Sequence, residues 1–216
     1  MRLLFVCTGN ICRSPLAERL ATAWADQRLG PVAANVYIAS AGTDALDGRA
    51  MDKRSAAALT GLGGDPNGFA ARTLVPEMAT HADLVLTMTR RQRRLVLADA
   101  PRALRHTFTL PEAADLLQTA DLRGVTELPL HTRARELAVR LNAGRAHRMS
   151  IEADDVNDPI GHSGSVHKEV GARIARKLRP LADILFAEGA AGQQWSPRPA
   201  MRQLPDLREL ARPRTR

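Results

Sequence analysis

One stretch decides the fold: Arg2-Leu3-Leu4-Phe5-Val6-Cys7-Thr8-Gly9-Asn10-Ile11-Cys12-Arg13-Ser14-Pro15. Its apolar run shows no polar alternation, which is typical of a strand buried on both faces. Ser14 is a favourable N-cap and Pro15 suits the first helical position, so we expect a helix to begin there. The residues between the strand and the helix must therefore turn tightly.

The residues after Cys7 have the composition of an anion-binding loop. A helix N-terminus offers unpaired N–H groups and the positive end of a dipole. Gly9 and Asn10 tolerate left-handed backbone angles, which turn successive N–H groups inward, and Arg13 can add a bidentate fork. We expect the phosphate-binding residues to be Thr8, Gly9, Asn10, Ile11, Cys12, Arg13 and Ser14.

Cys7 would lie beneath the bound anion. A cysteine beside an arginine at a helix N-terminus loses its proton more readily than a free thiol, so Cys7 is predicted to be a thiolate nucleophile near neutral pH. Ser14 can donate a hydrogen bond to its sulfur. The structural alternative is a buried cysteine on a core strand, with Arg13 solvated.

The run from Val6 to Pro15 resembles the phosphate-binding loop of the low-molecular-weight protein tyrosine phosphatases. The resemblance continues through residues 40–43 and 82–88 and through Asp158-Pro159, and it covers most of residues 1–188. It implies dephosphorylation of phosphotyrosine in proteins, through a cysteinyl-phosphate on Cys7 that Arg13 holds. Asp158 would be the general acid. The competing residues Asp154 and Asp155 are expected to be solvated loop charges or a cap.

The resemblance also assigns supporting roles. Ser40 would support the loop through hydrogen bonds together with Asn10 and Ser14, although a strand-end serine that caps a turn is an equal alternative. Pro159 would fix the backbone beside the acid.

The expected substrate wall departs from the family pattern. Leu46 and Ile160 stand where many members carry aromatic residues, and Phe69 replaces the histidine of a His-x-Ala-Arg pattern. An aromatic ring can still pack on aliphatic side chains. The phosphate chemistry is thus expected to be intact, with the phosphotyrosine preference left open.

Strands alternate with helical segments along the chain, which predicts a parallel sheet. The fold class is α/β, and the resemblance implies three α/β/α layers around four strands in the flavodoxin-like order 2-1-3-4. We expect strands at 3–6, 36–39, 83–88 and 107–110. We expect helices at 14–29, 49–62, 76–81, 90–97, 111–118, 133–141 and 163–185, the last kinked at Pro180. Ligands bind at the carboxyl ends of parallel strands, where Cys7 lies.

Two domain-level predictions follow. Residues 1–188 would form one phosphatase-like domain with an insertion around 119–150, to which the sequence assigns no role. Residues 189–216 form a basic tail rich in Pro and Arg, which we expect to be disordered.

Composition limits the other classes. The 216 residues have a formal charge of +8, but only 3% are aromatic, which disfavours nucleic-acid binding. The two cysteines do not form a disulfide framework or a zinc site, and they suit a reducing cytosol. The apolar run before Cys7 is too short for a signal peptide, and no stretch is long and apolar enough to span a membrane. A cytoplasmic protein is expected.

Three alternatives stay open. A thioredoxin-coupled arsenate reductase needs resolving cysteines downstream, and none follows Cys12. A non-catalytic phosphate-recognition module would need neither the thiolate nor the acid. Cys12 would either form a protective disulfide with Cys7 or contribute only its N–H. No metal and no cofactor are expected, and the protein substrate and the oligomeric state are left open.

Overall fold

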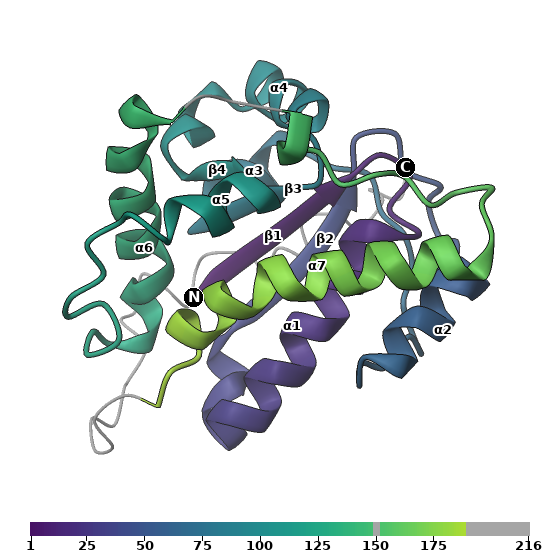
Figure 1. Cartoon of the computed structure of the whole chain (residues 1–216), viewed down its shortest axis with the longest axis horizontal. Helices are drawn as coiled ribbons and strands as arrows, with labels where there is room; N and C mark the ends of the chain where they lie inside the picture. Colours follow the sequence, from purple (N-terminus) through teal and green to yellow (C-terminus); the bar gives the residue numbers. More distant parts are fainter. Residues whose placement is uncertain (149–151, 189–216) are drawn as a thin grey trace, which may run out of the picture.

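A computed structural model describes residues 1–148 and 152–188. Its centre is a parallel sheet in the order β2-β1-β3-β4, which confirms the predicted fold class (Figure 1). The strands are β1 (Arg2–Cys7), β2 (Tyr37–Gly42), β3 (Leu84–Thr87) and β4 (Thr107–Thr109). All residues of β1 are buried, because the strand lies between two neighbours and is covered on both faces. The predicted tail at 189–216 lies outside the described residues.

Helices cover both faces of the sheet. The helices are α1 (Arg13–Leu29), α2 (Lys53–Gly61), α3 (Pro76–His81), α4 (Arg90–Asp99), α5 (Leu110–Leu116), α6 (Leu130–Gly144) and α7 (Gly164–Leu185). Short 3₁₀ turns are η1 (Gly30–Asn35), η2 (Pro101–His106), η3 (Arg145–His147) and η4 (Glu152–Asp154). Leu3 and Phe5 of β1 face the core formed with α1, α5, α6 and α7, whereas Leu4 and Val6 face α3 and α4.

The start of α1 differs from the prediction. The helix begins at Arg13, its N-cap is Cys12, and no side chain caps it. Ser14 lies inside the first turn and is fully buried. Its hydroxyl donates to the sulfur of Cys7 at 2.9 Å. Ser14 is therefore not the N-cap, because its side chain is committed to the preceding strand end.

The start of α2 also differs from the prediction. The backbone N–H of Ala71 donates to the carbonyl of Arg49 at 2.8 Å, which holds this residue outside the helix. Asp52 then caps α2 by accepting from the N–H groups of Arg54 and Ser55 at 2.9 and 3.1 Å. The helix therefore begins at Lys53.

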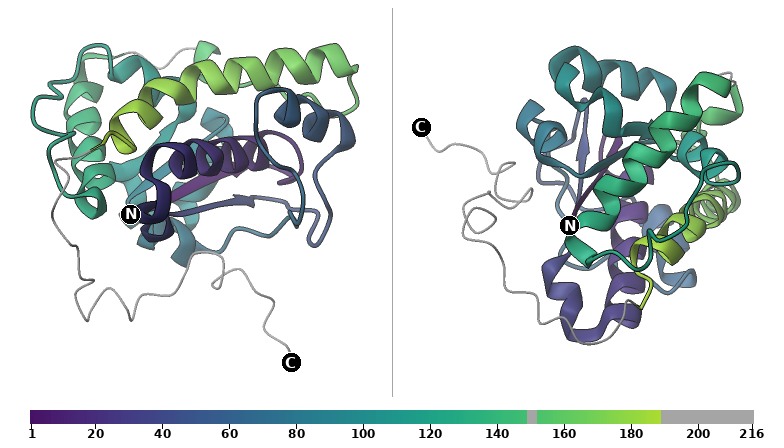
Figure 2. Two further views of the ribbon diagram at one scale, coloured as in Figure 1. Left: turned by 90° about the horizontal axis from the view of Figure 1, so that it is seen from below. Right: turned by 90° about the vertical axis from the view of Figure 1, so that its left-hand side faces the viewer.

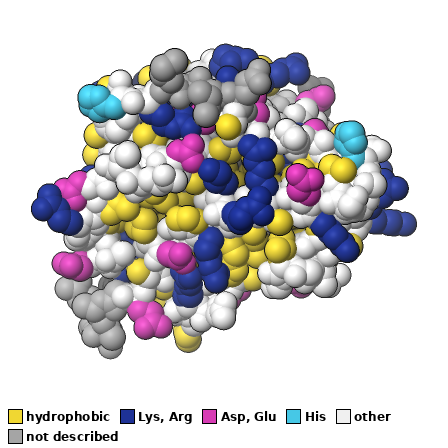
Figure 3. Space-filling view, in the orientation of Figure 1, with side chains coloured by type: hydrophobic (Ala, Val, Ile, Leu, Met, Phe, Trp, Pro, Cys, Tyr) yellow, Lys and Arg dark blue, Asp and Glu magenta, His cyan; other side chains and the backbone are white. Residues whose placement is uncertain are grey.

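The predicted helix α7 is long and continues through Pro180 to Leu185. It lies across α1 and next to α2 in all views (Figures 1 and 2). On the face of Figure 1, Lys and Arg side chains gather near the middle, beside hydrophobic surface (Figure 3). None of the helices within 1–148 and 152–188 is long and apolar enough to cross a membrane.

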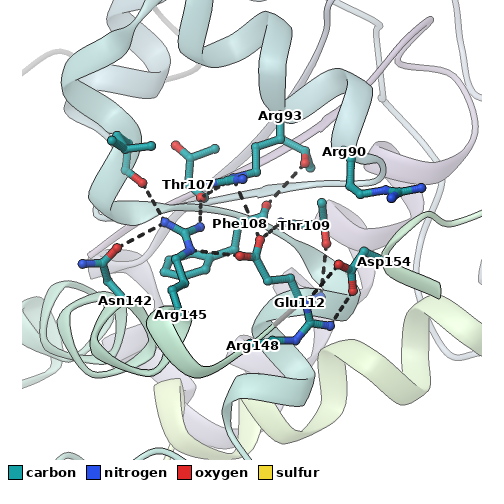
Figure 4. Close-up of polar contacts among 12 residues, drawn as sticks. Arg90, Arg93, Thr107, Phe108, Thr109, Glu112, Asn142, Arg145, Arg148 and Asp154 are labelled. Atoms are coloured by element: carbon teal, nitrogen blue, oxygen red, sulfur yellow. Dashed lines mark hydrogen bonds and ion pairs between the residues drawn. The ribbon is translucent and has the colours of Figure 1, made fainter. Parts of the chain in front are cut away.

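Residues 119–148, which belong to the predicted insertion, are held to the sheet by an arginine cluster (Figure 4). Arg145 donates to Glu112 Oε1 at 2.9 Å, to the Leu104 carbonyl at 3.0 Å and to the Thr107 carbonyl. Its guanidinium lies 3.9 Å from the centre of the Phe108 ring. We call Arg145 and these partners the Arg145 cluster. It gives the insertion a structural role that the sequence did not reveal.

Candidate active site

The loop between β1 and α1 places Cys7 at the carboxyl end of the central strand. The thiol is 2% exposed and accepts the hydrogen bond from Ser14 that the sequence predicted. The hydroxyl of Ser14 therefore points at the sulfur from the first turn of α1. The geometry is that of a nucleophile held at the base of a loop.

The carbonyl groups of this loop point outward. The N–H of Thr43 donates to the Cys7 carbonyl at 3.0 Å, and the N–H of Asp44 donates to the Thr8 carbonyl at 3.1 Å. The carbonyls of Gly9 and Ile11 likewise accept from the N–H groups of Leu46 and Asp52, at 3.2 and 2.9 Å. Because these carbonyls face the outer wall, the loop N–H groups are free to face an anion.

Asn10 fixes the turn of the loop. Its φ of 53° is left-handed, as predicted, whereas Gly9 does not have the left-handed conformation that the sequence suggested. The Asn10 amide nitrogen donates to Ser14 Oγ at 2.9 Å and to Ser40 Oγ at 2.8 Å. Its oxygen accepts from the Arg72 N–H at 2.9 Å. Ser40 thus contacts the loop rather than a turn alone.

Glu18 belongs to this chain of hydrogen bonds, and sequence reasoning missed it. Ser40 Oγ donates to Glu18 Oε2 at 2.6 Å, and Glu18 is only 3% exposed. Because the Ser40 hydroxyl donates to the Glu18 carboxylate, the Ser40 oxygen accepts from the Asn10 amide. The same amide donates to the Ser14 oxygen, which leaves the Ser14 hydroxyl to donate to the sulfur of Cys7. An acidic residue on the first turns of a predicted helix was the only signal, and such residues are usually solvated.

Close packing joins the loop to the end of β2. A Cβ built on Gly42 would lie 2.3 Å from the Thr8 carbonyl oxygen. Thr8 Oγ1 also accepts from Gln92 Nε2 of α4 at 3.1 Å. The loop is therefore held from both sides.

Arg13 and Asp158 meet although 145 residues separate them. The Arg13 guanidinium donates to the Val156 carbonyl at 3.0 Å and forms an ion pair with Asp158. Arg13 is 4% exposed, whereas the side chain of Asp158 is 44% exposed. Pro159, which follows the acid, is buried. The expected cysteine, arginine and acid thus share one edge of the sheet.

The expectation that the two other aspartates are solvated charges or a cap was wrong for Asp154, whereas Asp155 is 35% exposed and accepts from the first N–H of α4. Asp154 is 1% exposed and pairs with Arg148. Asp155 accepts from the N–H of Arg90 at 2.7 Å and pairs with its guanidinium at 3.2 Å. Both carboxylates hold the loop that carries Asp158 in place by pairing with Arg148 and Arg90. The sequence alone does not show these pairs.

The two expected wall residues are exposed at the mouth of the loop. Leu46 is 42% exposed, and its N–H binds the Gly9 carbonyl. Ile160 is 48% exposed, and its N–H donates to Asp158 Oδ1 at 3.3 Å. Phe69 is buried under the guanidinium of Arg19, 5.7 Å from the ring centre.

A second polar group forms behind the loop. Cys12, Asp52 and His167 bring ligand-type atoms within 4.8 Å of one another. His167 Nδ1 lies 2.8 Å from Ser55 Oγ, and both cysteines are free thiols. Burial raises the pKa of Cys12 to about 11, although a hydrogen bond with Ser55 opposes the shift. Cys12 is therefore a neutral thiol near pH 7. The sequence did not indicate this grouping, because its members lie far apart along the chain.

The fold, together with a cysteine, an arginine and an aspartate at one edge of its sheet, defines a protein of the cysteine-dependent phosphatase class. Comparison with known proteins gives the family. Residues 2–122 match the sequence model of the low molecular weight phosphotyrosine protein phosphatases. The chain belongs to this family.

Individual relatives agree with this assignment. The low molecular weight protein-tyrosine-phosphatase Etp of Escherichia coli K12 is 39% identical over 99 residues, 46% of this chain and 62% of the relative. The protein-arginine-phosphatase of Bacillus subtilis is 34% identical over 112 residues, 52% of this chain and 71% of the relative. The matched stretches thus span about two thirds of the curated relatives' length.

Solved structures match more of the chain. A mutant of the YwlE arginine phosphatase is 26% identical, with a TM-score of 0.62, and the match covers 87% of this chain and 97% of that one. The low molecular weight protein tyrosine phosphatase of T. tengcongensis is 27% identical, with a TM-score of 0.59. The match covers 85% of this chain and 98% of that one.

Proposed function

We propose that this protein hydrolyses phosphate monoesters, most favourably phosphotyrosine in proteins, through a cysteinyl-phosphate intermediate. The observation that carries the proposal is the convergence of three groups at one sheet edge. Cys7 accepts a hydrogen bond from Ser14, and Arg13 is paired with Asp158 beside it. A site that only bound phosphate would need neither the thiolate nor the acid.

In the first step the phosphate group enters the loop and replaces the Asp158 carboxylate at the Arg13 guanidinium. The phosphate dianion then lies beside Asp158. The repulsion between the two negative groups favours the protonated form of the Asp158 carboxyl over the carboxylate. The sulfur of Cys7 attacks phosphorus, the bond between phosphorus and the phenolic oxygen breaks, and Asp158 gives its proton to that oxygen. The phosphoryl group is now bound to sulfur, and Arg13 and the loop N–H groups hold its oxygens.

In the second step water attacks the phosphoryl group. Asp158, now a carboxylate, takes the proton of the water, and the bond between phosphorus and sulfur breaks. Inorganic phosphate and the Cys7 thiolate remain. A relative supports a covalent step, because a YwlE arginine phosphatase mutant has been solved with a phosphorylated active-site serine.

The substrate preference depends on the exposed aliphatic wall. Leu46 and Ile160 offer surface on which a phenyl ring can pack. Phosphoarginine is the second candidate, since arginine phosphatases are among the similar proteins and structures. Its aliphatic stem can pack on the same two residues.

The deciding experiment measures hydrolysis of p-nitrophenyl phosphate, a phosphotyrosine peptide and a phosphoarginine peptide without added metal. We expect turnover by the wild-type protein, unchanged by EDTA, and none by Cys7→Ser. Asp158→Ala should slow hydrolysis of the tyrosine ester by about 10²–10⁴-fold. A preference for the phosphoarginine peptide would replace phosphotyrosine by the second candidate. Binding without turnover in the wild type would identify a recognition module, and loss of activity in EDTA would show a metal requirement.

The remaining assignments are part of the same proposal. We propose that residues 1–188 form the catalytic domain and that the protein acts in the cytoplasm, where the two thiols stay reduced. The phosphate-binding, supporting and wall roles are those of the residues described above. No cofactor enters either step. Gel filtration followed by activity assay of a chain ending at residue 188 tests the domain boundary.

A further inference from the structure

A cavity lined by basic side chains and by apolar surface lies at the opposite edge of the sheet from Cys7. Its volume is about 320 Å³. It lies where β1 and β3 begin, between α6 and the end of α3, and the start of the chain passes beside α6 in Figure 2. Arg2 opens β1 and Cys7 ends it, so roughly 16 Å of extended strand separates this cavity from the nucleophile. The lining is basic and includes Arg2, Arg105, Arg135, His81 and His106.

Arg2 is a buried cation that has no counter-ion among the described residues. It is 7% exposed, and within the same residues its buried Nε has no hydrogen-bond partner. Within the described ranges, no carboxylate oxygen lies within 4.0 Å of its guanidinium. Buried charges are normally paired, since taking an ion out of water is costly, and a bound ion is one explanation for an unsatisfied buried group.

Asp83, the carboxylate that lines the cavity among the described residues, already has two partners. Asp83 accepts from the backbone N–H of Arg2 at 2.9 Å through one oxygen. Its other oxygen pairs with the Arg135 guanidinium at 2.9 Å. Asp83 is thus held between a main-chain donor and Arg135, and it does not neutralise the side chain of Arg2.

The net charge of the side chains that line the cavity indicates which kind of ligand would pair with Arg2. Arg2, Arg105 and Arg135 carry three positive charges and Asp83 one negative charge, which leaves two positive charges with neutral histidines. A phosphate monoester carries nearly two negative charges at pH 7, and guanidinium forks match its oxygens. The volume exceeds that of a phosphate group and falls near the lower end of small-molecule sites.

We propose that this cavity binds a small phosphate monoester at Arg2. The phosphate would lie between Arg2 and Arg105, with Arg135 as a third donor. The organic part would rest on Ala138 and Val139 of α6, and Val139 is 57% exposed. This site is separate from the phosphate loop and does not depend on the function proposed for Cys7.

The cavity binds its ligand without cleaving it. The Thr80 hydroxyl already donates to the Pro76 carbonyl at 3.0 Å. His106 Nε2 donates to the Ala79 carbonyl at 3.0 Å, and His81 Nδ1 donates to the Glu77 carbonyl at 2.8 Å. No cysteine or serine lines the cavity among the residues that the structure describes.

Calorimetric titration of the Cys7→Ser protein tests the site, because this variant cannot hydrolyse the probe. The probes are glucose 6-phosphate and inorganic phosphate, with glucose as the control that lacks phosphate. We expect two binding sites for glucose 6-phosphate, one in the loop and one in the cavity. The second variant, Cys7→Ser with Arg2→Met, should keep the loop site and weaken the other at least about tenfold, because charge-assisted hydrogen bonds are lost.

Two controls separate this result from misfolding. Arg102→Met removes an exposed arginine of η2 that does not line the cavity. It should leave the affinity of both sites for glucose 6-phosphate unchanged. Arg2→Met in the wild-type background should keep its hydrolysis rate, since it lies far from the loop. A single site that Arg2→Met does not change would overturn the proposal. Binding of inorganic phosphate but not of glucose 6-phosphate at Arg2 would overturn the monoester assignment.

Discussion

The phosphate loop and the Arg145 cluster use the same side chain in opposite ways. Arg145 directs its guanidinium at fixed acceptors: two carbonyls, the Glu112 carboxylate and Asn142, and it stacks on Phe108. Arg13 has one carbonyl and one carboxylate, and that carboxylate is the half-exposed side chain of Asp158. The comparison teaches that an arginine is available to a ligand when its acidic partner can move away.

The strongest test of this contrast replaces both arginines by lysine. Arg13→Lys keeps the charge but loses the two-pronged fork, and kcat/KM should fall about 10²–10³-fold, as when a transition-state donor is removed. Arg145→Lys should leave kcat/KM within about twofold, because the cluster does not touch the loop. Steady-state hydrolysis of p-nitrophenyl phosphate measures both. Equal losses in the two variants would contradict the division of roles.

Stability should show the reverse order. Arg145→Met leaves the Glu112 carboxylate without its nearest cation and should lower the free energy of unfolding by about 3 kcal/mol, near the lower limit for a broken buried pair. The matched control is Arg123→Met, whose wild-type side chain is 91% exposed and pairs with Asp121. It should change stability by less than about 0.5 kcal/mol. Urea denaturation measures both, and similar values would show that the cluster is not a structural anchor.

A glycine substitution links packing to the site. In Gly42→Ala the new methyl group would meet the Thr8 carbonyl at 2.3 Å, so the loop must shift. We expect a loss of about 1–3 kcal/mol in stability and a parallel fall in turnover. Gly164→Ala, where no atom lies within 4 Å of the added carbon, should change neither. Thermal melts and activity assays on the two variants decide whether the close approach matters.

The smallest effect concerns stability in acid and depends on Asp115 of α5. Burial raises the pKa of Asp115, but hydrogen bonds from Lys177 and Arg148 outweigh it and hold the pKa below its usual 3.8. A carboxylate whose pKa is lowered on folding stabilises the native state above its unfolded pKa. This stabilisation should disappear as the pH falls below about 4, and Asp115→Asn should flatten that part of the profile. Melting temperatures between pH 3 and 6 provide the check, and equal slopes would refute the expectation.

The sequence predicted the parts of this molecule that depend on local pattern. The buried run of β1 and the bounds of α3 agree with the apolar spacing and with Pro76. Predictions failed where a distant partner decides the structure. Ser14 does not cap α1 because Cys7 takes its hydroxyl, and Asp154 is buried because Arg148 neutralises it.

The same limit applies to the candidate site. Cys7 and Arg13 could be predicted from their spacing within one loop. Asp158 could be predicted from the proline that follows it and from the family resemblance. Glu18 and Gln92 were not, because their hydrogen bonds to Ser40 and Thr8 depend on how separate segments meet. Arg2 could not be singled out from the sequence either, because only its surroundings show that its guanidinium has no acidic partner among the described residues.

The pairing of Arg13 with Asp158 has a consequence for how the protein is made. Ribosomes add about 5–20 residues per second, so the 145-residue separation corresponds to roughly 7–30 s of synthesis. During that interval a growing chain holds the cysteine and its loop without the acid. Nascent molecules of this protein therefore cannot complete the proposed reaction cycle efficiently until the last segment of the domain has left the ribosome.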